Sequence, residues 1–342
     1  DASSVVSARA SAKTIGAAAV ATKGEANKVQ LITSYEEGKS VFGEDASGVY
    51  GMSALLKVLF QNGAGAVKAV AVGEDSNGTV DYASAFAALN EEEDVGIVVC
   101  DSAETSVHQS LKTSVENASA ARRERIAVVG GAEETVTQMT DHAKAINSER
   151  VVLVGPDVTL DSGAEASAVL AAAAVAGVIA GGGDASVPIN GAELAGINGV
   201  SKRLNDNEID QLVRGGVTPI ETVGGVSSPV RGITTKTSSG GAADTTWREL
   251  TTILIVDEVI PTIRSALRTR FARSKNTAQS RGAIRSQVVL ELEEMKSREI
   301  VDSYGEVLVS ALKSDPTVCL VEFSFTVAHG LNRIYLTAHI TV

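Results

Sequence analysis

The sequence has few of the residues that form cross-links, aromatic cores or catalytic centres. Among its 342 residues are only two cysteines, four histidines and 4% aromatic residues. Cys100 and Cys319 each lie in a strand-like run, so we expect buried free thiols in a reducing compartment and no disulfide framework. With hydrophobic residues at 44% of the chain, the core is expected to be aliphatic and rich in alanine.

Signals for a membrane or for secretion are also missing. The longest apolar stretch, 164–180, contains Glu165 and Ser167 and falls short of a membrane span. The first residues hold no apolar segment of the kind found in signal peptides. A net charge of −12 argues against general nucleic-acid binding. We therefore expect no membrane insertion and no direct contact with nucleic acid.

Motifs that carry chemistry are absent. The sequence has no P-loop, no GxSxG elbow and no HExxH. Two glycine-rich stretches, 63–65 and 181–183, stand in the wrong context for a nucleotide fingerprint. The histidines are scattered without ligand spacing, at His108, His142, His329 and His339. We expect no catalytic residue, no metal site and no cofactor.

The chain does contain a regular alternation of short apolar runs and amphipathic segments. Ser34 with Glu37, and Thr135 with Gln138, have the spacing of helix capping boxes. Strands are expected at Val29–Ile32, Ala66–Val72, Val95–Cys100, Ile126–Val129 and Val151–Val154, with helices after them, the last at Ser162–Ile179. This order predicts an α/β fold with a mostly parallel sheet and flanking helices.

The pattern divides the chain into four parts. Residues 1–24 are small and polar and are expected to form an extended N-terminal arm, with a short strand at Thr14–Ala21. Residues 25–200 form the α/β domain, 201–330 a C-terminal α+β domain, and 331–342 a C-terminal arm strand. In the C-terminal domain we expect strands at Val217–Val223 and Pro229–Thr235 and a helix at Gly282–Lys296. Between them, the segment Trp247–Ala272 is expected to start as a strand and continue as a helix, with Pro261 near the first turn of that helix.

The last stretch, Val318–Val342, has period-two alternation and predicts two strands joined by a turn at 328–332. The first strand places Val321, Phe323, Phe325 and Val327 on one face. The second places there Ile334, Leu336, Ala338, Ile340 and Val342. Such a strand either closes the sheet of its own domain or is donated to another subunit, and the alternation alone leaves both open.

A basic segment lies between Glu258 and Glu291, where no acidic residue occurs. It contains Arg264, Arg268, Arg270, Arg273, Lys275, Arg281 and Arg285. This segment is either a solvated basic face or a docking surface for an acidic protein or nucleic acid. Phe271 is the one aromatic residue within it, which gives little support for base stacking and favours an acidic protein.

Several segments together resemble contractile tail sheath proteins, which occur in contractile-tailed phages and in phage-tail-like bacteriocins. They span most of the chain in order: LITSYEEGKSVFG (31–43), GMSALLKVLFQNGAGAVKAVAV (51–72), LNDNEIDQLVRGGVTP (204–219), VRGITTKT (230–237) with Trp247, and ILIVDEVIPTIRSALRTRF (253–271). The resemblance implies an α/β core with N- and C-terminal arms that add strands to neighbouring subunits. It also implies a helical polymer of stacked hexameric rings that contracts and drives an inner tube through a target cell envelope.

The partners follow from the same resemblance. They are copies of the chain itself, an inner tube protein, and baseplate and tail terminator proteins. The chain is expected in the bacterial cytoplasm during assembly and then in the released particle or virion. On this basis we expect an inter-subunit strand at Ile334, Leu336, Ala338, Ile340 and Val342. We expect inner-tube contacts from Arg264, Arg268, Arg270, Arg273, Lys275 and Arg281.

Two other functions remain open at this point. The first is an α/β enzyme that binds a small phosphorylated ligand at its glycine-rich strand ends, Gly130-Gly131, Gly155 and Gly181–Gly183. The second is a nucleic-acid-binding factor that uses the basic segment.

Overall fold

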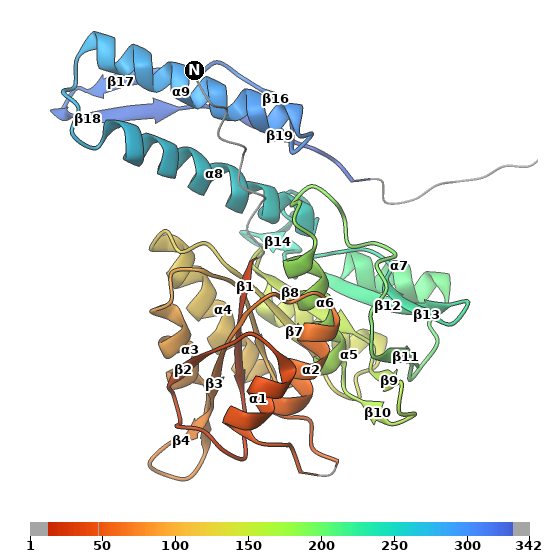
Figure 1. The fold of residues 1–342 in the computed structure, drawn as a ribbon. Helices are drawn as coiled ribbons and strands as arrows, with labels where there is room; N and C mark the ends of the chain where they lie inside the picture. Colours follow the sequence, from red (N-terminus) through yellow and green to blue (C-terminus); the bar gives the residue numbers. More distant parts are fainter. Residues whose placement is uncertain (1–12, 47, 331–342) are drawn as a thin grey trace, which may run out of the picture. The chain divides into compact units, whose positions relative to one another are not determined.

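The computed structural model describes residues 13–46 and 48–330, and the chain divides into two compact units (Figure 1). The N-terminal unit consists of Asp1–Gly183 and Ile189–Leu250. The C-terminal unit consists of Asp184–Pro188 and Thr251–Val342. The domain limits expected from the sequence stay predictions, although residues 201–250 have their contacts within the N-terminal unit.

The N-terminal unit is built on an eight-stranded sheet (Figure 1). In spatial order its strands are β13 (Val226–Pro229), β12 (Val217–Val223), β8 (Val151–Gly155), β7 (Ile126–Gly130), β6 (Val95–Cys100), β1 (Thr14–Ala19), β3 (Val67–Ala71) and β2 (Val29–Ile32). The six inner strands are parallel, and β13 and β2 are antiparallel at the two edges. The mostly parallel sheet expected from the sequence is therefore confirmed.

Helices cover both faces of this sheet. One face carries α2 (Met52–Gln61) and α6 (Ala168–Gly181), with α1 (Tyr35–Phe42) packed on α2. The other carries α3 (Tyr82–Asn90), α4 (Thr105–Ala120), α5 (Val136–Ile146) and α7 (Asp206–Arg214). The Ser34 hydroxyl caps α1 by accepting from the Glu37 amide, and Thr135 and Gln138 form the expected capping box.

The short strand expected at Thr14–Ala21 is confirmed as β1, but the extended arm expected around it is wrong for residues 14–19. β1 lies inside the sheet, between β3 and β6 (Figure 1). Ile15 and Ala17–Ala19 are fully buried. Their small side chains looked too weak for a core, but a strand covered by helices on both faces needs them, because a Cβ on Gly16 would lie only 3.0 Å from Val95 Cγ1.

The remaining elements of the N-terminal unit are short. β9 (Val158–Leu160), β10 (Glu165–Ala166) and β11 (Ile197–Val200) form a three-stranded sheet, and β4 (Gly73–Glu74) with β5 (Val80–Asp81) and β14 (Ser238–Ser239) with β15 (Ala242–Ala243) form two ribbons. The helix expected from Ser162 begins at Ala168. The strand expected at Pro229–Thr235 is also wrong, because β13 ends at Pro229 and a single bridge, Ile233 to Glu249, follows.

The C-terminal unit contains two long helices, α8 (Leu250–Phe271) and α9 (Ala278–Ser297). The prediction that Pro261 lies near a first turn was wrong, because α8 begins at Leu250 and Pro261 lies in its interior. The run at 253–256 looked like a strand because it is β-branched and apolar, yet Ile253, Leu254 and Ile255 are buried on this helix. None of the described helices has the length and apolarity needed to cross a bilayer.

A bent antiparallel ribbon completes the unit (Figure 1). β16 (Val301–Tyr304) pairs with β19 (Phe325–Val327), and β17 (Leu308–Leu312) pairs with β18 (Asp315–Glu322). The single strand expected over 321–327 is therefore interrupted at residues 323–324, opposite 305–307 on the other side of the ribbon. The expected alternation is confirmed, since Val321, Phe323, Phe325 and Val327 are half-buried and the residues between them are exposed.

Candidate interaction surface

The ribbon β17–β18 has one face that the described part of the unit leaves uncovered. Val309, Ala311, Cys319 and Val321 form the half-buried face, and α9 contacts β17. The opposite face, here called the outer face, carries four exposed apolar side chains: Leu308 (50% exposed), Leu312 (38%), Val318 (42%) and Leu320 (40%). A cluster of apolar residues on one strand face is typical of a surface that another protein covers.

The edges of the ribbon are open as well. Within the described residues, β17 and β18 each pair with one strand only, so each has a row of backbone N–H and C=O groups that no strand pairs with, although Asn276 occupies the carbonyls of Pro316 and Val318 on β18. A two-stranded ribbon is marginal in water, and a free edge is a template for a further strand. The ribbon thus offers both hydrogen-bonding edges and an apolar face to an added strand.

The residues expected to form the donated strand, Ile334, Leu336, Ala338, Ile340 and Val342, lie outside the described residues. Their expected role stays a prediction.

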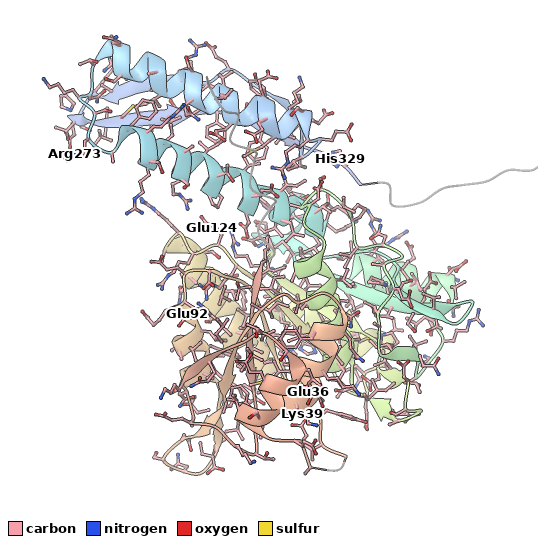
Figure 2. The ribbon with its side chains drawn as sticks, in the orientation of Figure 1. Glu36, Lys39, Glu92, Glu124, Arg273 and His329 are labelled. Atoms are coloured by element: carbon pink, nitrogen blue, oxygen red, sulfur yellow. The ribbon has the colours of Figure 1, made fainter. Side chains whose placement is uncertain are left out.

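The basic segment, residues 264–285, comprises the end of α8, the turn that follows it and the start of α9; it is here called the basic turn, and Figure 2 labels Arg273 on it. Arg268, Arg270, Arg273 and Lys275 are exposed, whereas Arg264 and Arg281 are partly buried. Arg268, Arg273 and Lys275 form no ion pair with any residue that the structure describes. The turn therefore presents at least three cations without a described counter-ion, and their contact with an inner tube stays a prediction.

Hydrogen bonds fix the basic turn against the ribbon. Asn276 Nδ2 donates to the carbonyl oxygens of Pro316 (2.7 Å) and Val318 (3.2 Å) at the start of β18. Arg281 Nη1 donates to Asn276 Oδ1 at 3.0 Å, and Arg270 donates to Gln287. Two of the expected contact residues thus hold the turn in shape. The basic turn and the apolar outer face form one continuous end of the unit.

The two units differ in charge. The C-terminal unit contains eleven Lys and Arg residues and eleven Asp and Glu residues, so the net charge of −12 belongs to the N-terminal unit. Within the C-terminal unit the cations gather at the basic turn, and the acidic residues Asp257, Glu258, Glu291, Glu293 and Glu294 lie toward the opposite ends of the two helices. A neutral unit with one basic end suits an acidic partner.

A buried polar cluster in the N-terminal unit was not found from the sequence. His108 of α4 and His142 of α5 stack with ring centroids 5.0 Å apart, and His108 Nδ1 lies 2.9 Å from His142 Nε2. The Ser102 carbonyl lies 2.8 Å from His108 Nε2, and Glu134 Oε1 lies 2.7 Å from His142 Nδ1. Burial lowers the pKa of His108 to about 4. One rule could have found this cluster: helices that follow two successive parallel strands lie side by side, which brings α4 with His108 next to α5 with His142.

A second polar group, Asp101, is partly buried at the end of β6. Asp101 accepts from the backbone amide of Val20 at 2.8 Å and from the Tyr82 hydroxyl at 2.6 Å. Burial raises the pKa of Asp101 to about 6 and also raises the pKa of Tyr82. Burial raises the pKa of the neighbouring Cys100 thiol to about 12, so this cysteine is protonated and unreactive at neutral pH.

The glycine-rich strand ends proposed for a phosphorylated ligand are filled by the protein itself. A Cβ on Gly130 would lie 2.2 Å from the carbonyl group of Ala168, and one on Gly155 would lie 2.4 Å from Met139 Sδ. Gly181 lies against the backbone of Gly63. These glycines allow close packing of helices on the sheet. Among the described residues, no group of three or more His, Cys, Asp or Glu side chains could hold a metal ion.

Comparisons with known proteins cover most of the chain. Residues 75–235 match a model described as the phage tail sheath protein central domain, and residues 242–341 match the phage tail sheath C-terminal domain. The tail sheath protein of Bacillus phage SP01 is 27% identical over 253 residues, which is 72% of this chain. The alignment spans only 43% of that relative's length.

Solved structures share the fold at low sequence identity. The helical sheath of the anti-feeding prophage in its contracted state is similar with a TM-score of 0.72, 16% identity, and coverage of 99% of this chain and 96% of that one. The contracted sheath complex of the PVC extracellular contractile injection system has a TM-score of 0.73, 16% identity, and coverage of 97% and 93%. The crystal structure of a sheath tail protein from Desulfitobacterium hafniense has a TM-score of 0.71, 12% identity, and coverage of 92% and 96%.

Proposed function

Because this chain belongs to the phage tail sheath family, we propose that it is a structural subunit of a contractile tail sheath. The subunits polymerise helically around an inner tube, and contraction drives the tube through a target cell envelope. The observation that carries the proposal is the match of two sheath domain models, in order, to residues 75–235 and 242–341. The subunit has no catalytic role in this proposal; it assembles in the bacterial cytoplasm and becomes part of the tail particle.

The decisive experiment is electron microscopy of the purified chain, alone and with its inner tube protein. We expect rings or tubes with six-fold symmetry and a central channel. A chain that remains monomeric at high concentration, with and without the tube protein, would contradict the proposal.

The C-terminal strand links neighbouring subunits in this proposal. Residues Ile334–Val342 of one copy add to the edge of β17 in another copy, and the outer face of the ribbon, with Leu308 and Leu320, packs against the neighbouring copy. The open edges and the exposed outer face support this arrangement. Once one face is buried, a strand cannot shift its register without exposing its apolar side chains, so the link persists while other contacts change.

Truncation tests the strand link. A chain that ends at Asn332 keeps every described element and loses only the donated strand. We expect this variant to fold, with unchanged thermal unfolding, and to form no tubes. Tubes formed by the truncated chain at the same protein concentration as the full chain would exclude strand donation.

The basic turn contacts the inner tube in the extended sheath and releases it on contraction. Exposed ion pairs contribute only about 0–1 kcal/mol each, so a set of them binds the tube and still separates readily. The exposed cations Arg268, Arg273 and Lys275, which have no described counter-ion, support this role. Baseplate and tail terminator proteins complete the set of partners.

Charge reversal tests the tube contact. The triple variant Arg268→Glu, Arg273→Glu and Lys275→Glu should polymerise but lose its binding to isolated inner tubes in a co-sedimentation assay. The matched control reverses three exposed cations of the N-terminal unit, Lys202, Arg203 and Arg214, and so makes the same change in net charge. Equal binding by both triple variants would refute the assignment.

A further inference from the structure

The hydrogen-bond polarity of the buried histidine pair determines how many protons it holds. The Ser102 carbonyl only accepts, so His108 Nε2 at 2.8 Å carries a hydrogen. His108 is fully buried, and its lowered pKa keeps it neutral at pH 7, so its Nδ1 is an acceptor. His142 Nε2, 2.9 Å away, must therefore donate to it. This leaves His142 Nδ1 facing Glu134.

The contact between His142 Nδ1 and Glu134 Oε1 holds one further proton. At 2.7 Å two bare lone pairs would repel, so either the imidazole or the carboxyl carries a hydrogen. The other carboxyl oxygen, Glu134 Oε2, is buried and has no hydrogen-bond partner. The His142 side chain is 2% exposed, so solvent does not compensate a missing hydrogen bond there.

We propose that the chain Ser102–His108–His142–Glu134 is a proton-dependent latch that joins α4 to α5 only while His108 is neutral. In acid, a proton on His108 Nδ1 points at the donor hydrogen of His142 and the latch opens. The latch links the helices that follow β6 and β7.

Other ionisable groups on the surrounding elements have separate partners. On α4, Lys112 donates to the Ile146 carbonyl at 2.7 Å, and Glu116 accepts from Ser148 at 2.6 Å. Past β8, Asp157 accepts from the amides of Glu133 and Ala168. Near Ser102, the Cys100 thiol is protonated, and Asp101 gains a proton in the same acid range as His108 with the opposite effect on stability. Each variant is therefore compared with the unaltered chain at the same pH.

The sign of the effect follows from proton counts. A free imidazole has a pKa of about 6.5, so below that pH the open state binds a proton on His108 that the closed state refuses. The opening constant then rises up to tenfold per pH unit toward pH 4.

Amide hydrogen exchange of the full chain, followed by mass spectrometry from pH 4.5 to 8.5, measures this opening in α4 and α5. After correction for intrinsic exchange rates, the opening constant should rise as the pH falls below about 6.5. His108→Gln keeps a donor toward Ser102 and an acceptor toward His142 but cannot gain a proton, so it should lose this acid limb. Glu134→Gln can still donate to His142 and leaves His108 in place, so it should keep the acid limb.

The control is His329→Gln, which removes an exposed histidine of the C-terminal unit and should leave the profile unchanged (Figure 2). A flat profile for the unaltered chain would overturn the proposal, as would an acid limb that persists in His108→Gln. Nitrogen NMR of the unaltered chain is a test that needs no variant. It should find His108 protonated at Nε2 and bare at Nδ1 at pH 7, and the opposite tautomer would overturn the latch.

Discussion

Polar substitution of the ribbon's outer face should weaken sheath assembly while the subunit still folds. Leu308 is 50% exposed and Leu320 is 40% exposed, so roughly half of each side chain is still to be buried by a partner. Full burial of a leucine contributes about 1.5–3 kcal/mol, and covering the remaining half therefore contributes about 1 kcal/mol per residue. The double variant Leu308→Ser and Leu320→Ser should lose about 2 kcal/mol per inter-subunit contact, or roughly 30-fold in affinity.

The assay is the lowest protein concentration at which tubes form, measured by sedimentation and checked by electron microscopy. We expect this concentration to rise by about 30-fold in the double variant. The buried halves of the two side chains contribute a similar amount, about 2 kcal/mol, to folding of the unassembled subunit, so assembly is measured at a temperature at which thermal unfolding shows both proteins to be folded.

The matched control lies on another hairpin. Val223 and Val226 of β12–β13 are 62% and 43% exposed, so Val223→Ser with Val226→Ser removes similar exposed apolar surface from the N-terminal unit. Its tubes should form at nearly the normal concentration. If the ribbon variant assembles as readily as this control, the outer face is not covered in the assembly and the reasoning is refuted.

Three further substitutions test the N-terminal unit, each by urea unfolding. Gly130→Ala should cost about 3 kcal/mol or more, because its Cβ would meet the Ala168 backbone at 2.2 Å; a loss below 1 kcal/mol would contradict this packing. Arg125→Met should cost about 2–4 kcal/mol, because the buried guanidinium donates to the carbonyls of Leu89 and Glu92; Arg125→Lys should restore little of it. Asp101→Asn should flatten the dependence of the free energy of unfolding on pH between pH 4 and 6. The pKa of the Asp101 carboxyl is raised to about 6 in the folded protein, so this group contributes about 3 kcal/mol of stability at low pH that is lost as the pH rises. An unchanged slope would exclude this carboxyl as the source of the pH dependence.

The α/β sheet was predictable because its signals are local. Continuous apolar runs such as Val95–Cys100 indicate strands covered on both faces, and capping residues such as Thr135 mark where helices begin. The alternation of the two element types then predicts parallel pairing. None of these inferences needs knowledge of which segments meet in space.

β1 was assigned to an arm because its sequence, TIGAAA, is weakly apolar. Its place inside the sheet depends on the helices packed above and below it, which require small side chains. The interruption of the ribbon at 323–324 likewise depends on its pairing partner across the sheet, and no residue in that strand predicts it.

The candidate surfaces were predictable only as residue lists. Charge spacing identified the basic turn, but the side chains that hold the turn, Arg270 and Arg281, looked the same as those that are free. His108 and His142 are 34 residues apart, and only the packing of α4 on α5 brings their rings together. Both the basic turn and the histidine pair depend on contacts between segments far apart in the sequence, and the sequence pattern does not reveal those contacts.

The position of β1 inside the sheet has a mechanical consequence. This strand is bonded to β3 on one side and β6 on the other, both parallel to it. A pull on the chain before Thr14, directed along the strand, loads the hydrogen bonds of both ladders at once, so that they share the force. A strand at the sheet edge, pulled across its ladder, would open one bond at a time. Any tension that reaches the subunit through its N-terminal residues is therefore carried by a strand that is held on both sides.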